Sequence, residues 1–147
     1  MAEPITSACH LLLLDGTSLL LLRRFNTGYE DGNYSVVAGH IERGESPREA
    51  MKREALEEAN IDLHLKHLQF AHIMFRRKDD GSIKADFFFT CTRWLGEVKN
   101  AEPHKCDELR WCDRHRLPPN TIPYISAALA HIDDGQAFSE FGWTEHQ

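Results

Sequence analysis

The chain has 147 residues, of which 41% are hydrophobic and 27% are charged, and its formal net charge is −6 at pH 7. This length suits one domain whose core is large enough to fold without disulfide staples. The acidic balance argues against a protein that holds duplex nucleic acid or an anionic membrane by bulk charge. It is compatible with a small phosphorylated substrate, because carboxylates can bind phosphate through metal ions.

The apolar runs at residues 11–14 and 19–22 are separated by Asp15-Gly16. Together they are shorter than the roughly 20 residues that a bilayer span requires. No Lys or Arg precedes them, unlike in a signal peptide, so we expect a cytoplasmic protein that does not enter a membrane. The cysteines form no C-x-x-C pair, which favours structural thiols over a zinc site; they are Cys9, Cys91, Cys106 and Cys112.

The first predicted elements are strands. Residues 5–14 and 18–24 are apolar and flank the turn Asp15-Gly16-Thr17, which predicts a hairpin. Residues 25–33 contain two glycines and mixed polarity, which predicts a loop, and residues 34–37 follow as a short strand.

A helix is predicted over residues 46–59. Ser46-Pro47-Arg48-Glu49 has the pattern of a capping box with proline at the first helical position. Asn60 stands where the chain must leave the helix, and asparagine tolerates the left-handed conformation better than most residues. We expect Ile61 to fold back on Leu56 and complete a Schellman-type stop.

The second half of the chain predicts another hairpin, with strands at 67–76 and 83–93 around Asp79-Asp80-Gly81. Residues 87–89 are all phenylalanine and therefore apolar on both strand faces, which predicts a central strand. A short strand near 108–111 and a helix near 124–132 complete the pattern. Strands with helices on both faces predict an α/β sandwich around a mixed sheet.

The helix carries a cluster of acidic residues. At about 100° per residue, Glu54, Glu57 and Glu58 fall within roughly a 100° sector. We expect them on one exposed strip, opposite an apolar side formed by Met51, Ala55, Leu56 and Ala59. Clustered carboxylates suit Mg²⁺ or Mn²⁺, and Glu42, Glu45 and the Gly39 carbonyl are further candidate oxygens. On spacing alone, the favoured alternative is a solvated acidic helix face, which is the commoner case for a glutamate-rich helix.

Residues 39–61 read GHIERGESPREAMKREALEEANI. This segment resembles the Nudix box, G-x(5)-E-x(7)-R-E-U-x-E-E-x-G-U, where U is a bulky aliphatic residue. The matching positions are Gly39, Glu45, Arg53, Glu54, Glu57, Glu58 and Ile61. Ala55 is a small version of U, and Asn60 replaces the second glycine at the helix exit. Ala38 and His40 flank Gly39 where many members have proline and glycine, which affects the substrate pocket rather than the metal site.

The resemblance implies a Nudix-type α/β/α sandwich with a central mixed sheet, formed by a single domain over residues 1–147. It implies Mg²⁺ or Mn²⁺ as the cofactor, with Gly39, Glu54, Glu57 and Glu58 as ligands. Arg53 would orient the carboxylates, and Glu45 would pair with Arg53. Glu54 is the first choice for the general base, with Glu102 and Glu108 as alternatives.

The family also implies hydrolysis of a phosphoanhydride bond in a nucleoside diphosphate derivative. Residues 76–79 lack the proline and the tyrosine that mark the ADP-ribose and dinucleoside polyphosphate subfamilies, and the coenzyme A pattern is absent. By elimination we expect a pyrophosphatase that converts a (deoxy)nucleoside triphosphate to the monophosphate and pyrophosphate. The alternatives are a nucleotide sugar or pterin triphosphate hydrolase, and a non-catalytic nucleotide-binding module.

The expected partner is a small nucleotide, without a nucleic acid polymer or a membrane, and a homodimer is possible. Arg76, Arg77, Lys78 and His40 are weak candidates for substrate contacts. The two arginines and the lysine adjoin a predicted hairpin tip, where charges are usually solvated, and a histidine in an exposed loop is a common alternative for His40. The aromatic side chains of Phe138, Phe141 and Trp143 could stack on a base, but we favour a tail that covers a core edge.

Overall fold

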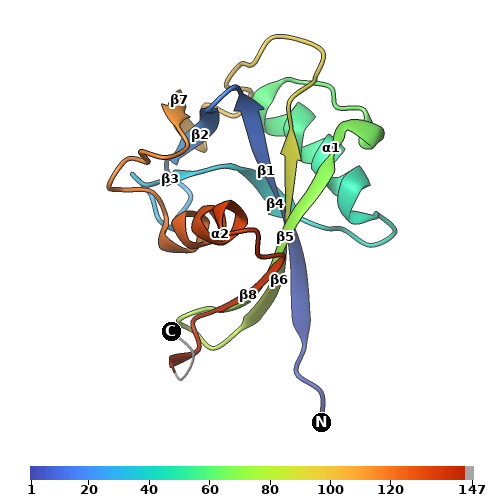
Figure 1. Cartoon of the computed structure of the whole chain (residues 1–147), viewed down its shortest axis with the longest axis vertical. Helices are drawn as coiled ribbons and strands as arrows, with labels where there is room; N and C mark the ends of the chain where they lie inside the picture. The colour runs from blue at the N-terminus through green and yellow to red at the C-terminus, as the bar shows by residue number, and fades with distance from the viewer. Residues whose placement is uncertain (145–147) are drawn as a thin grey trace.

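The computed structural model describes residues 1–144, and Figure 1 shows a strongly twisted sheet with one helix on each side. In chain order the elements are β1 (Ile5–Asp15), β2 (Ser18–Arg24), β3 (Tyr34–Ser35), β4 (Val37–His40), α1 (Pro47–Ala59), the 3₁₀ helix η1 (Leu65–His67), β5 (Gln69–Arg77), β6 (Ile83–Cys91), β7 (Cys106–Asp113), α2 (Pro123–Asp133) and β8 (Phe138–Phe141).

Strand β1 is the centre of the sheet. One edge of β1 pairs with β6 in parallel along nine positions, from Ile5 with Ile83 to Leu13 with Cys91. The other edge pairs with β4 and then, at its end, with β2. The main path through the sheet is β3-β2-β1-β6-β5-β8, with β7 added to β2. The sheet is mixed, as the sequence predicted.

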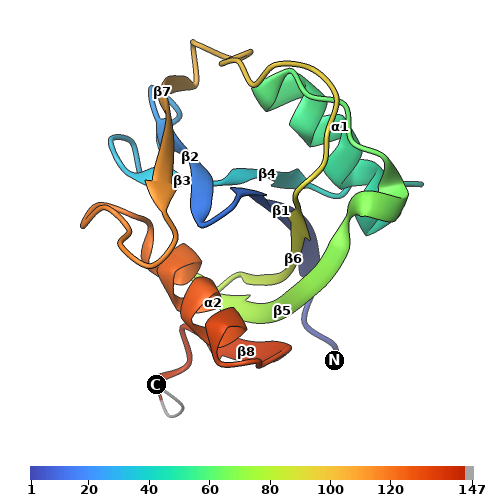
Figure 2. The same cartoon turned by 45° about the horizontal axis from the view of Figure 1, so that its top comes forward.

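Two apolar cores lie on the two faces of the sheet. Cys9, Leu11 and Leu13 of β1 pack with the apolar side of α1, while Leu12 and Leu14 pack with α2. Because neighbouring strand residues point to opposite faces, the continuous apolar run of β1 reflects burial on both sides. Figure 2 shows α1 and α2 on the two sides of the strands. No helix in residues 1–144 has the length and hydropathy of a bilayer span.

Helix α1 begins and ends where the sequence predicts. The Ser46 hydroxyl accepts from the Glu49 amide, and the Glu49 carboxylate accepts from the Ser46 amide, which completes the capping box. Asn60 adopts the left-handed conformation, with φ 61°. The predicted packing of Ile61 on Leu56 is wrong: Ile61 is fully buried, but Leu56 is 56% exposed and lies outside the apolar side.

The sequence interpretation missed two features of the sheet. The strand expected at residues 34–37 is two short strands, because β3 pairs with β2 whereas β4 pairs with β1. The C-terminal tail covers a sheet edge, as favoured, but it does so as a strand: β8 pairs with β5 in parallel. Trp143 stacks on Phe75 at 5.9 Å between ring centroids, and Phe138 remains 58% exposed.

Candidate active site

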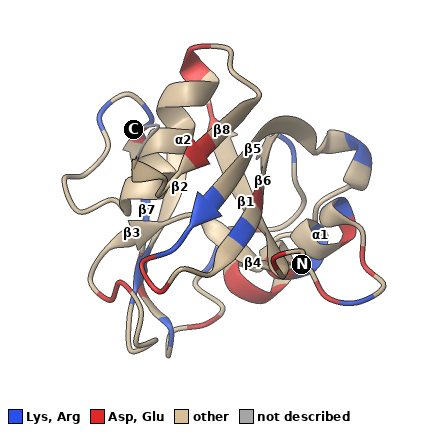
Figure 3. Ribbon diagram, turned by 90° about the horizontal axis from the view of Figure 1, so that it is seen from below, with Lys and Arg blue, Asp and Glu red and all other residues tan. Residues whose placement is uncertain are grey.

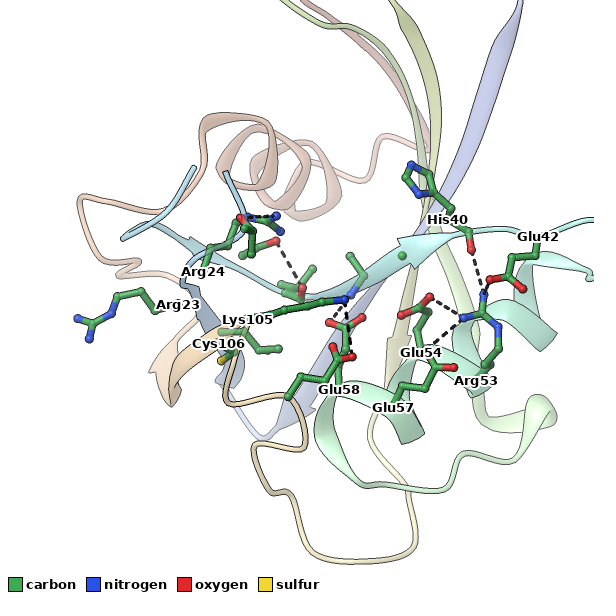
Figure 4. A pocket seen from close by; sticks show the side chains of 17 residues that line it. Arg23, Arg24, His40, Glu42, Arg53, Glu54, Glu57, Glu58, Lys105 and Cys106 are labelled. Atoms are coloured by element: carbon green, nitrogen blue, oxygen red, sulfur yellow. Dashed lines mark hydrogen bonds and ion pairs between the residues drawn. The ribbon is translucent and has the colours of Figure 1, made fainter. Parts of the chain in front are cut away.

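A cavity of about 470 Å³ lies between α1, β4, the end of β2 and the start of β7. Figure 4 shows the glutamates of α1 pointing into this cavity. We call it the acidic pocket, because its wall includes the carboxylates of Glu42, Glu54, Glu57, Glu58 and Glu102. The Nudix-like segment thus forms one wall, and Glu102 reaches the same space from the loop before β7.

Arg53 holds the loop before α1 against the helix. Its guanidinium makes two hydrogen bonds to the Glu45 carboxylate, at 2.7 and 2.9 Å, and a third to Glu54 Oε1 at 2.7 Å. It also donates to the His40 carbonyl oxygen at 3.0 Å. The paired guanidinium lowers the pKa of Glu45 to about 2. The predicted contact between Glu45 and Arg53 is present. Arg53 also bonds to Glu54 and so fixes the position of that carboxylate.

Gly39 leaves room for the close approach of the Glu54 carboxylate. A Cβ atom built on Gly39 would lie 2.1 Å from Glu54 Cδ, far inside van der Waals contact. The carboxylate of Glu54 therefore occupies the space that any other residue at position 39 would fill. Cys9 lies behind this contact, and its thiol donates to the Gly39 carbonyl at 3.5 Å. Burial, followed by the charges of Glu54 and Glu58, raises the pKa of Cys9 to about 12.

The expectation of one exposed acidic strip is wrong. Glu57 is half exposed, but only 13% of the Glu54 side chain is exposed, and Glu58 is partly buried with its carboxylate 3.4 Å from the Ala38 amide. Burial, with Glu54 as the next cause, raises the pKa of Glu58 well above its usual range. The strip faces β4 and the pocket, so it is not a solvated helix face.

The donor set fits a hard divalent cation. Carboxylate and carbonyl oxygens are the ligands that Mg²⁺ and Mn²⁺ prefer. The side chains of Glu54 and Glu58 lie close together, and of these two Arg53 hydrogen-bonds only to Glu54. Within residues 1–144 no three acidic, histidine or cysteine side chains already converge as a finished metal site. The carboxylates of Glu54, Glu57 and Glu58 line one cavity and are therefore suitable oxygen donors for such a cation.

The wall opposite α1 is basic. Figure 4 shows Lys105 extending from that wall toward the glutamates, with Arg24 beyond it. Lys105 lies 4.0 Å from Glu102, and Arg23 and Arg24 also line the cavity. We did not predict these three residues, because they come from the end of β2 and from a distant loop. Two adjacent arginines at a strand end were the only local signal.

Not all predicted site residues meet in this pocket. Glu108 lies outside its lining and accepts from the Tyr34 hydroxyl at 2.7 Å. Arg77 lies over the ring of Trp143. His40 lines the pocket, but its ring points away from the glutamates (Figure 4) and lies 2.6 Å from the Lys84 amine.

The expectation that Arg76 is a solvated hairpin charge is also wrong. Only 5% of Arg76 is exposed, and it donates to the buried Asp86 carboxylate at 2.6 and 3.3 Å. His10 lies 2.9 Å from the same carboxylate. Burial acts to raise the pKa of Asp86, but His10 and Arg76 outweigh it and lower the pKa to about 2.

Comparison with known proteins agrees with this geometry. The family model of the NUDIX domain matches residues 4–131. An 8-oxo-dGTP diphosphatase from Haemophilus influenzae is 30% identical over 93 residues, which are 63% of this chain and 64% of that protein. The match therefore spans less than two thirds of that relative.

Solved structures share the fold. A MutT NUDIX hydrolase from Burkholderia pseudomallei superposes with a TM-score of 0.80 at 21% identity, over 87% of this chain and 98% of its own. A MutT protein from Methanosarcina mazei Go1 superposes with a TM-score of 0.78 at 18% identity, over 92% and 97%. The extent of the family match and the arrangement of Gly39, Arg53 and the α1 glutamates lead to one conclusion: the chain belongs to the NUDIX domain family.

Proposed function

We propose that the chain is a Mg²⁺- or Mn²⁺-dependent hydrolase that cleaves a phosphoanhydride bond in a nucleoside diphosphate derivative. One observation carries this proposal: Glu54, Glu57 and Glu58 line a cavity beside Gly39, and Arg53 holds the first of them in place. Within the described chain, this is where carboxylates, a cavity and cationic groups for phosphate occur together.

In this proposal, Glu54, Glu57, Glu58 and the Gly39 carbonyl hold the divalent ions. When bound, such ions offset charge on phosphate oxygens and lower the pKa of water. Arg53 and Glu45 act as positioning residues, because their two parallel hydrogen bonds fix the guanidinium that orients Glu54. Lys105 and Arg24 stand opposite and offer positive charge to substrate phosphates.

We propose Glu54 as the group that takes the proton from the attacking water, with Glu102 as the alternative. Both line the cavity. Glu108 is the weaker alternative, because Tyr34 and Arg23 occupy its carboxylate. A general base must lie within hydrogen-bond reach of its water, directly or through one more water.

For the substrate we propose a (deoxy)nucleoside triphosphate, cleaved to the monophosphate and pyrophosphate. The H. influenzae relative named as an 8-oxo-dGTP diphosphatase supports this class. A nucleotide sugar or a pterin triphosphate is the alternative within the same chemistry. A substrate panel assayed with and without Mg²⁺ or Mn²⁺, with products identified, separates these compounds. Homodimer formation stays a prediction.

The test of the metal role is Glu58→Gln, which keeps the size of the side chain but removes its charge. Replacing groups that only support metal ligands costs roughly 10–100-fold in activity or metal affinity, and loss of a ligand should exceed this. Glu97→Gln is the matched control, since Glu97 is exposed and outside the pocket.

The variants and the substrate panel together separate a hydrolase from a non-catalytic binding module. Full turnover by Glu58→Gln, with Mg²⁺ present and the fold intact by circular dichroism, would remove the proposed metal role. A panel in which the wild-type chain binds nucleotides but cleaves none would instead support the binding module.

A further inference from the structure

A second, smaller cavity adjoins the acidic pocket at β4. Its volume is about 200 Å³, and the two cavities share Arg24, Ala38, Gly39 and His40. No Asp or Glu lines it within the described chain. We call it the basic pocket, because its ionisable lining residues apart from Tyr29 and Tyr124 are all basic: His10, Arg24, His40, Arg76, Lys78 and Lys84.

Two lysines of the basic pocket have no acidic partner. Across residues 1–144, neither Lys78 nor Lys84 has a carboxylate oxygen within ion-pair distance. The Lys84 amine instead lies 2.6 Å from His40 Nε2, and the Lys78 amine lies 5.4 Å from the centre of the Tyr29 ring. Figure 3 shows basic positions at the end of β5, where the turn between β5 and β6 begins.

The charges around Lys84 are unbalanced. Burial, followed by the neighbouring Lys78 and Arg76, lowers the pKa of Lys84. Asp86 and Asp80 act in the opposite direction and do not offset these causes. Asp86 is already shared by Arg76 and His10. An anion in the pocket would supply the balancing negative charge.

A buried polar atom of the same cavity also lacks a hydrogen-bond partner. His10 is only 2% exposed and lines the basic pocket, and its Nε2 is satisfied by Asp86. Its Nδ1 has no hydrogen-bond partner among the described residues. Buried polar atoms are paired in the great majority of cases. The exception here lies in the same cavity as Lys78 and Lys84, the two lysines without a carboxylate partner.

The size of the basic pocket selects the kind of ligand. Small-molecule sites usually enclose roughly 300–1,000 Å³, so this cavity suits a substituent of a ligand whose remainder lies elsewhere. The two positive charges of Lys78 and Lys84 match the double negative charge of a phosphate monoester better than the single charge of a carboxylate. The two cavities share the lining residues Gly39 and His40, so a molecule of nucleotide size spans the distance between them.

We propose that the basic pocket binds a second phosphate group on the organic part of the substrate, apart from the diphosphate that lies over α1. This narrows the proposed (deoxy)nucleoside triphosphate to one that carries an additional phosphate on its sugar. This inference rests on the proposed function for the diphosphate end of the substrate. The binding of an anion in the basic pocket can be tested independently of that function.

The first experiment measures anion binding alone. Methyl phosphate is titrated into the isotope-labelled full chain at pH 8 without divalent cations, where it is a dianion because its second pKa is about 6. Without metal the acidic pocket repels a dianion, so we expect amide shifts at His10, His40 and Lys84 and none at Glu57. Lys84→Gln should weaken binding by about tenfold, the effect of losing one charge-assisted hydrogen bond.

Lys78→Gln gives an independent test if Lys84→Gln disturbs β6, and Lys66→Gln is the control, since Lys66 is exposed and lies in η1. The control should bind methyl phosphate like the wild type. Shifts confined to α1, or equal binding by the wild type and both pocket variants, would overturn the anion site.

The second experiment compares adenosine 5′-monophosphate with adenosine 3′,5′- and 2′,5′-bisphosphates by calorimetry with Mg²⁺. We expect at least one bisphosphate to bind about tenfold more tightly, and Lys84→Gln to remove that difference. Equal affinities of the three ligands would overturn the substrate assignment. Methyl phosphate binding without Mg²⁺-dependent cleavage of any panel compound would leave the anion site standing and reject the proposed function, whereas the reverse result would reject only this inference.

Discussion

The acidic and basic pockets meet at β4 but are built in different ways. The carboxylates of Glu54, Glu57 and Glu58 come from adjacent turns of α1. The charges of the basic pocket come from β1, β2, β4, β6 and the end of β5 and its following turn. The carboxylate cluster of the acidic pocket is therefore a property of one helix, whereas the charge of the basic pocket is a property of the assembled sheet.

The comparison explains what holds each pocket together. The acidic pocket depends on Arg53 and on the absence of a side chain at Gly39. The basic pocket lies over the buried group of His10, Arg76 and Asp86. A substitution among the residues that support one pocket should leave the other pocket unchanged. The following substitutions test this separation in order of decreasing effect.

Asp86→Asn should have the largest effect. It leaves the Arg76 guanidinium buried without its counterion, and breaking a buried ion pair costs about 3–5 kcal/mol. Chemical denaturation should show this loss in the free energy of unfolding. Asp107→Asn is the matched control, because its pair with Arg23 is about one third exposed and should contribute little. Equal losses for the two variants would contradict a special role of the buried group.

Asp86 also predicts the response to acid. Its pKa in the folded chain is about 2, below the value of about 3.9 in an unfolded chain. Its contribution to stability is therefore complete above about pH 4 and is lost as the pH falls toward 2. Unfolding free energies measured between pH 2 and 5 should fall less steeply in Asp86→Asn than in the wild type. Parallel slopes would contradict the ion pair.

Gly39→Ala should remove activity with little effect on stability. The added Cβ meets the far end of the Glu54 side chain, which can move, so the fold should tolerate the change. The displaced carboxylate would no longer face the proposed metal site, and we expect about a 100-fold loss of turnover. Methyl phosphate binding should remain. Unchanged turnover would show that the position of Glu54 is unimportant.

Arg53→Lys should reduce turnover by roughly 10–100-fold although it keeps the charge. A lysine cannot make the two parallel hydrogen bonds to Glu45 while also holding Glu54. Because Arg53 is a positioning residue, the Mg²⁺ concentration needed for half-maximal rate should rise as well. A fall in rate without that rise would place Arg53 in direct contact with substrate.

Ser46→Ala should have the smallest effect. Losing the helix cap costs about 1 kcal/mol of stability, and Ser46→Asp should restore most of it because aspartate supplies a capping oxygen. Since the cap belongs to α1 alone, methyl phosphate binding should not change in either variant. Weaker binding in Ser46→Ala would show that the two pockets are coupled.

Much of the fold and of the acidic pocket could be predicted because their signals are local. The apolar runs of β1 and β2 and the turn between them are legible in sequence, and so is the cap at Ser46. Helical spacing alone predicts that the three glutamates share one side of α1. The pairing of Glu45 with Arg53 came from the family resemblance, and the structure shows the contact.

The missed features are all long-range. β8 is recognisable only beside β5, because four residues of mixed polarity carry no clear strand period. Arg76 looked like a surface charge because its partner Asp86 lies ten positions further on, across the hairpin. The burial of Glu58 depends on β4, which covers one end of α1.

The amino-acid order by itself determined where the strands turn, where α1 starts and stops, and which carboxylates share its side. Those properties follow from backbone propensities and from repeat distances of a few residues. Only the tertiary structure decided which charges are buried, which of them are paired, and that a cationic cavity lies behind Gly39. Burial and charge pairing depend on segments far apart in the chain, so no short stretch of residues can encode them alone.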